Sequence, residues 1–150
     1  MKLMKAIFSA ISHMLVFVVV PFILITLINL NYPGILAGKE NYLMTVVIFV
    51  GIPIALSYFI MELTESPLKK MIFEILAISL VLIWTFLVMG AGETVMYYLK
   101  IKIILYYPAL LTLILISISI RYPAAILRYY SAKQMYAQMK TPQNSVQEAQ

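Results

Sequence analysis

Residues 71–89 read MIFEILAISLVLIWTFLVM, a stretch whose only charged side chain is Glu74. A helix rises about 1.5 Å per residue, so a stretch of this length crosses the roughly 30 Å hydrocarbon core of a bilayer. We therefore predict a membrane span here, with the Glu74 carboxylate about one turn inside its edge. An ionised group at that depth is costly, and it usually has a partner or a function.

The composition of the whole chain supports a membrane protein. Its 150 residues are 63% hydrophobic and only 11% charged, whereas a soluble domain is about half apolar and about a quarter charged. Three more apolar runs of spanning length lie at 6–30, 42–61 and 103–120. We predict an all-α polytopic membrane protein, a four-transmembrane-helix bundle with a C-terminal amphipathic cytoplasmic helix. The predicted helices lie near residues 5–30, 42–63, 68–90 and 101–121, and the last continues to about residue 139.

The segments between these runs set the domain organisation. Residues 1–140 are predicted to form the transmembrane domain, and residues 141–150 a polar C-terminal tail. The first apolar run follows two lysines, as in a signal peptide, but it is too long for one, so we expect a retained first span. Residues 93–102 mix tyrosines and lysines with apolar residues, which suits a membrane interface.

The basic residues predict the orientation. With four spans, one side of the membrane receives eight lysines and arginines, and the other side receives three. Cytoplasmic loops carry the excess of basic residues, so we expect both termini to be cytoplasmic, in a cell (plasma) membrane of prokaryotic type. The eight are Lys2, Lys5, Lys69, Lys70, Arg121, Arg128, Lys133 and Lys140, and the three are Lys39, Lys100 and Lys102.

Glu74 and Arg121 are the candidate intramembrane ion pair. The predicted topology places both near the inner edge of the hydrocarbon, on neighbouring antiparallel spans, and pairing would lower the cost of both charges. A structural pair, or an arginine that reaches the headgroups alone, is the simplest interpretation. An ion or proton path, or a Glu74 contact to another subunit, is the alternative.

His13 is the only histidine, and it shares a helix face with Ser9. One histidine cannot build a zinc site without other ligands, and no second histidine is present to complete bis-histidine haem ligation. We therefore interpret His13 and Ser9 as a candidate interhelical polar contact. A haem or quinone contact of His13 remains the less favoured alternative.

The missing residue types limit the possible functions. The chain has no cysteine and no aspartate, which removes thiol chemistry, cysteine metal sites and the usual catalytic triads. We expect no cofactor, no metal, no nucleic acid and no catalysis by this chain alone.

Two functions stay open. The favoured one is a small non-catalytic accessory or structural subunit of a larger membrane complex, for which an energy-transducing complex is one candidate. The alternative is a small homo-oligomeric channel or transporter that uses Glu74 and Arg121. The expected partners are the lipid bilayer and either other membrane subunits or further copies of the chain.

Overall fold

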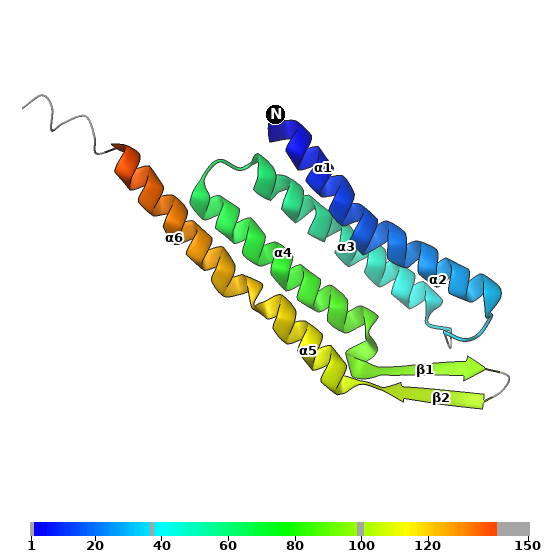
Figure 1. The fold of residues 1–150 in the computed structure, drawn as a ribbon. Coiled ribbons are helices and arrows are strands. Elements are labelled where there is room, and N and C mark those ends of the chain that lie inside the picture. The colour runs from blue at the N-terminus through cyan, green and yellow to red at the C-terminus, as the bar shows by residue number, and fades with distance from the viewer. Residues whose placement is uncertain (1, 37, 99–100, 141–150) are drawn as a thin grey trace, which may run out of the picture.

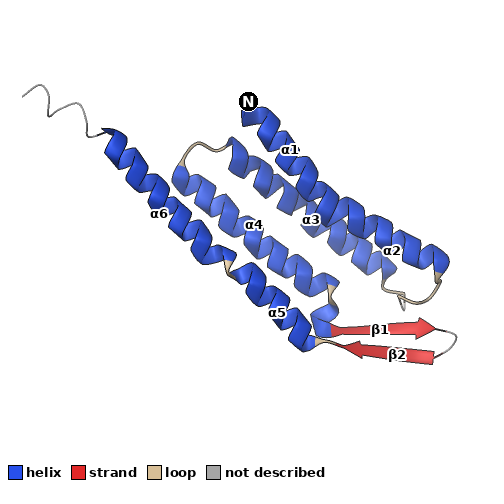
Figure 2. Cartoon of the chain, viewed as in Figure 1, coloured by secondary structure: helices blue, strands red, loops and turns tan. Residues whose placement is uncertain are grey.

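The computed structural model describes residues 2–36, 38–98 and 101–140. Helices account for most of this part, and one two-stranded antiparallel sheet interrupts them (Figures 1 and 2). The elements in chain order are α1 (Lys2–Met14), the π-helical turn η1 (Leu15–Val19), α2 (Val20–Asn31), α3 (Glu40–Leu63), α4 (Pro67–Val88), the 3₁₀ turn η2 (Gly90–Gly92), β1 (Glu93–Tyr98), β2 (Ile101–Tyr106), α5 (Pro108–Ser119) and α6 (Arg121–Lys140).

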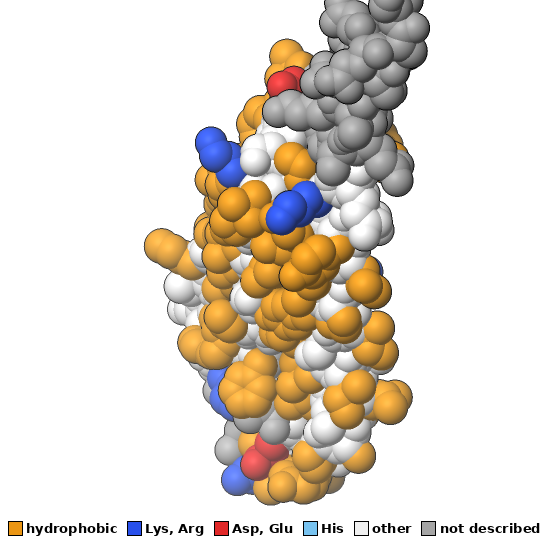
Figure 3. Space-filling model, turned by 90° about the vertical axis from the view of Figure 1, so that its left-hand side faces the viewer, with side chains coloured by type: hydrophobic (Ala, Val, Ile, Leu, Met, Phe, Trp, Pro, Cys, Tyr) orange, Lys and Arg blue, Asp and Glu red, His pale blue; other side chains and the backbone are white. Residues whose placement is uncertain are grey.

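Four helical stretches are long and apolar enough to cross a membrane, as predicted. They are Lys2–Asn31, Glu40–Leu63, Pro67–Val88 and Pro108–Met135. Serine and threonine hydroxyl groups are compatible with an apolar surrounding here, because most of them donate to the carbonyl four residues back in their own helix. Thr85, for example, donates to Val81 (2.8 Å). Figure 3 shows a face on which hydrophobic side chains cover the middle and charged side chains lie toward both ends.

The four spans lie side by side in an open row. α3 packs between α1 and α4, and α5 and α6 pack on the other side of α4 (Figure 1). Only 11% to 33% of the residues in the most apolar window of each span are buried. Most of the apolar surface therefore needs lipid or another chain to cover it, and closure into a bundle stays a prediction.

The contact between the first span and α3 is close. A Cβ added at Gly51 would lie 2.7 Å from the carbonyl oxygen of Phe17, so only glycine fits there without a shift. Phe17 belongs to the π-helical turn, which comes just before Pro21. Proline lacks an N–H for the carbonyl four residues back, and a π-turn is one way for a helix to accommodate that loss.

The start of the fourth span differs from the prediction. Residues 101–106 form strand β2, which pairs antiparallel with β1 from Glu93↔Tyr106 to Tyr98↔Ile101, so the expected helix start at residue 101 is wrong. β-branched and aromatic residues are frequent in both segments, and such residues favour strands. The helix begins at Pro108, a residue that fits the first helical position because its missing N–H would have no partner there.

The predicted helix beyond residue 121 is present as α6, which ends at Lys140. A break at Ile120 separates it from α5. Pro123 explains the break, because it cannot donate to the carbonyl of Ser119. The amphipathic character of α6 stays a prediction, and the polar tail 141–150 lies outside the described residues.

Candidate functional site

Glu74 has a partner on the fourth span, but that partner is Arg128. The Arg128 guanidinium donates to Oε1 of Glu74 in a direct ion pair. The Glu74 side chain is 14% exposed and that of Arg128 is 65% exposed. The carboxylate is thus mostly covered by protein, while the guanidinium reaches outward from α6.

The late start of the fourth span explains why Arg128 occupies the place expected for Arg121. With the helix starting at Pro108, Arg121 is only thirteen residues along it. Tyr122 fixes the level of this turn against α4, because its hydroxyl lies 2.7 Å from Oγ of Ser79. Ser79 already donates to the carbonyl of Ile75, so the Tyr122 hydroxyl is the donor in that bond.

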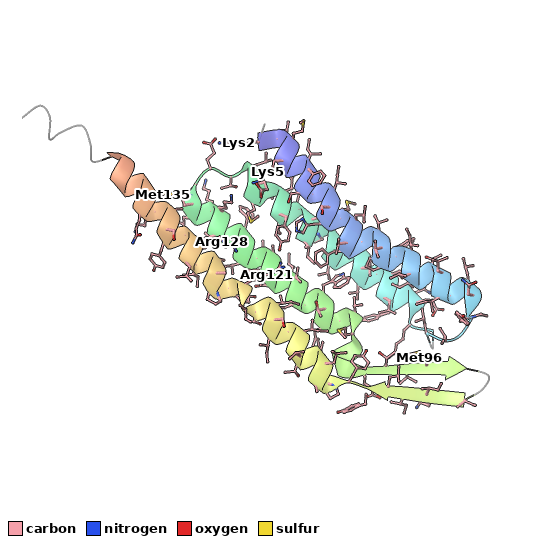
Figure 4. The ribbon with its side chains drawn as sticks, in the orientation of Figure 1. Lys2, Lys5, Met96, Arg121, Arg128 and Met135 are labelled. Carbon is pink, nitrogen blue, oxygen red and sulfur yellow. The ribbon has the colours of Figure 1, made fainter. Side chains whose placement is uncertain are left out.

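Arg121 therefore lies near the middle of the membrane-spanning region. Its neighbour Tyr122 contacts Ser79, which is twelve residues from the start of the 22-residue helix α4, about 18 Å along a helix about 33 Å long. Figure 4 shows Arg121 well below Arg128 along the same helical segment. Within residues 2–36, 38–98 and 101–140, the Arg121 side chain makes no hydrogen bond or ion pair.

Arg121 lines a half-open groove of about 420 Å³ between the spans. Phe17, Tyr58, Thr85 and Ser117 contribute to its walls, and the remaining lining residues are aliphatic. The hydroxyls of Thr85 and Ser117 donate to carbonyls of their own helices. Arg121 is consequently the one charged residue among those that line an otherwise mostly apolar groove, to which Tyr58 also contributes.

His13 contacts α3 through its ring. Its Nδ1–H donates to the carbonyl oxygen of Ser9 in the same helix (2.7 Å), and its ring stacks on Tyr58 with 3.7 Å between centroids. This bond uses only the backbone of Ser9 and lies within one helix, so the predicted polar contact between helices stays a prediction. The stack on Tyr58 is what joins His13 to α3. Nearby, Phe17 meets the edge of Trp84, whose buried Nε1 has no hydrogen-bond partner among the described residues.

A second group of charges lies at the end of the molecule that holds the N-terminus (Figure 4). Lys2 pairs with Glu65 (2.6 Å), and Lys5 pairs with Glu62 (3.2 Å). The hydrogen bond from Lys2 and its positive charge hold the pKa of the Glu65 carboxyl below its ordinary value. These pairs tie α1 to the end of α3 and to the α3–α4 connection, so we interpret them as structural.

Sequence reasoning missed Arg128 as the partner of Glu74. The signal that could have found it is Pro108, because starting the fourth helix there moves every later residue deeper into the membrane. No three acidic, histidine or cysteine side chains come together as a metal site within the described part of the chain. The chain matches no family model, and neither curated proteins nor solved structures show a significant match.

Proposed function

We propose that this chain is a small non-catalytic integral membrane protein that serves as an accessory or structural subunit of a larger membrane complex. In this proposal, the open groove at Arg121 is where a transmembrane helix of another subunit docks. The docked helix supplies the cover that the row of four spans lacks.

The position of Arg121 carries this proposal. A guanidinium near the middle of a bilayer costs several kcal/mol unless it has a partner, water or access to the headgroups. Glu74 is already engaged by Arg128, and it is the only acidic residue within the apolar part of α4. A carboxylate or a polar group from another chain is therefore the natural partner of Arg121.

We further propose that both termini are cytoplasmic, in the plasma membrane, with the end of α6 extending into the cytoplasm as an amphipathic helix. The eight-to-three bias of basic residues supports this orientation. The chain has no cysteine, so single cysteines at Gln134 and Asn41 can be compared. An impermeant thiol reagent outside intact cells should label residue 41 and spare residue 134, and the reverse pattern would refute the orientation.

The competing proposal is a small homo-oligomeric channel or transporter that uses Glu74 and Arg121. The observation in its favour is the same groove, which is half-open and has one positively charged residue, Arg121, in its lining. Against it, Glu74 and Arg121 line different cavities, and the nearby hydroxyls bond to their own helices. A path for ions would therefore need polar groups from further copies of the chain.

The mass of the native particle separates these proposals. The protein is extracted in a mild detergent and weighed by native mass spectrometry, as the wild type and as Arg121→Gln. A complex with defined foreign subunits that falls apart in Arg121→Gln supports the subunit proposal. A symmetric assembly of this chain alone, unchanged by the substitution, contradicts it and favours the competing proposal.

A further inference from the structure

The β1–β2 hairpin exposes apolar side chains that the described part of the chain does not cover. Ile101, Ile103, Ile104 and Leu105 are between 42% and 64% exposed. A two-stranded hairpin alone is at best marginally stable in water. The hairpin therefore needs a cover that residues 2–36, 38–98 and 101–140 do not supply.

The strand register divides the hairpin into two different faces. Residues that pair across an antiparallel ladder share a face, and neighbours along a strand alternate. The pairs Thr94↔Leu105 and Met96↔Ile103, with Ile101, make one face that has no charged side chain among its described residues, and we name it the apolar face. The mixed face carries the remaining described side chains, Glu93, Val95, Lys102, Ile104 and Tyr106.

Tyr107 fixes which face turns toward the membrane. Its hydroxyl donates to the carbonyl of Met89 at the end of α4 (2.9 Å), and it accepts from Oγ1 of Thr94 (2.5 Å). Thr94 belongs to the apolar face, so this face looks toward the end of the membrane-spanning helix. Glycine is required nearby, because Gly92 has φ +87° and a Cβ added there would lie 2.9 Å from Cα of Pro108. The hairpin thus starts close to the beginning of α5.

We propose that the hairpin is an interfacial anchor that lies along the membrane surface opposite the N-terminus. Its apolar face rests on the boundary of the hydrocarbon, and Glu93 and Lys102 point to the headgroups and water. Lipid is the occupant that fits, because the hairpin joins two spans directly and its base is held at the end of α4 (Figure 1). Tyrosine is also enriched at this depth of a membrane, where Tyr106 is 75% exposed.

Spin-label accessibility tests this placement, because the wild-type chain has no cysteine. Single cysteines at Ile103 and Leu105 on the apolar face, and at Ile104 and Tyr106 on the mixed face, each carry a nitroxide in lipid vesicles. We expect residues 103 and 105 to collide preferentially with oxygen, which concentrates in hydrocarbon. Residues 104 and 106 should collide several-fold more often with a water-soluble nickel chelate, so accessibility alternates along the strand.

Two reference positions calibrate the measurement. Ile116 on α5 reports the hydrocarbon, and Gln134 on α6 reports water. If residues 103 to 106 all match Gln134, the hairpin stands in water and the proposal is wrong. If residues 103 and 105 are shielded from both collision partners, protein rather than lipid covers the apolar face, and the proposal is equally refuted.

Discussion

Arg121 and Arg128 lie in the same helix, α6, but have different surroundings. Arg128 neutralises Glu74, whereas Arg121 faces an apolar groove without a described partner. The sequence allowed either arginine to pair with Glu74, since both follow the fourth apolar run. Only the start of that helix decides between them, and a boundary read from sequence is commonly uncertain by two to four residues.

A double-mutant cycle tests which arginine is the partner. Glu74→Gln and Arg128→Gln should each lower the free energy of unfolding in detergent, because each leaves the other group unpaired. The loss in the double variant should be smaller than the sum, with a coupling energy of about 1 kcal/mol. Arg121→Gln is the matched control, and it should add to Glu74→Gln without coupling. Coupling of Glu74 to Arg121 instead of Arg128 would contradict the described ion pair.

At the scale of elements, long apolar runs were predictable and the hairpin was not. Three of the spans can be predicted from their length and apolar composition alone, and the glycines and prolines between them are strong turn signals. In residues 93–107 the apolar and aromatic residues fit an interfacial strand as well as the first turns of a helix. The pairing that decides between them joins residues in two separate strands, so no local pattern reveals it.

Tyr107 should hold the hairpin against the end of α4. In Tyr107→Phe the bonds to Thr94 and Met89 are lost, which costs locally about 1–2 kcal/mol. We expect faster amide hydrogen exchange in β1 and β2 with little change in α3 and α4. Tyr106→Phe is the control, because that ring is mostly exposed and its hydroxyl makes no described hydrogen bond. Equal exchange in both variants would mean that Tyr107 does not fasten the hairpin.

At the scale of the molecule, the sequence predicted the class of the protein better than the arrangement of its helices. Composition alone indicated a membrane protein with four spans, because few other environments tolerate so much apolar sequence. The open row could not be predicted, since it depends on side-chain contacts between helices, such as the close approach at Gly51. That row leaves the groove at Arg121 accessible, and this accessibility is the basis of the proposed docking site.

Site-specific photo-cross-linking in living cells tests the central claim, that another subunit occupies this groove. A photoreactive amino acid replaces Ser117, which lines the groove, or its neighbour Ile116, which does not. We predict that residue 117 forms one discrete adduct with a foreign membrane protein, that Arg121→Gln abolishes this adduct, and that residue 116 does not form it. An adduct of residue 117 with a second copy of this chain, or with lipid alone, would contradict the claim.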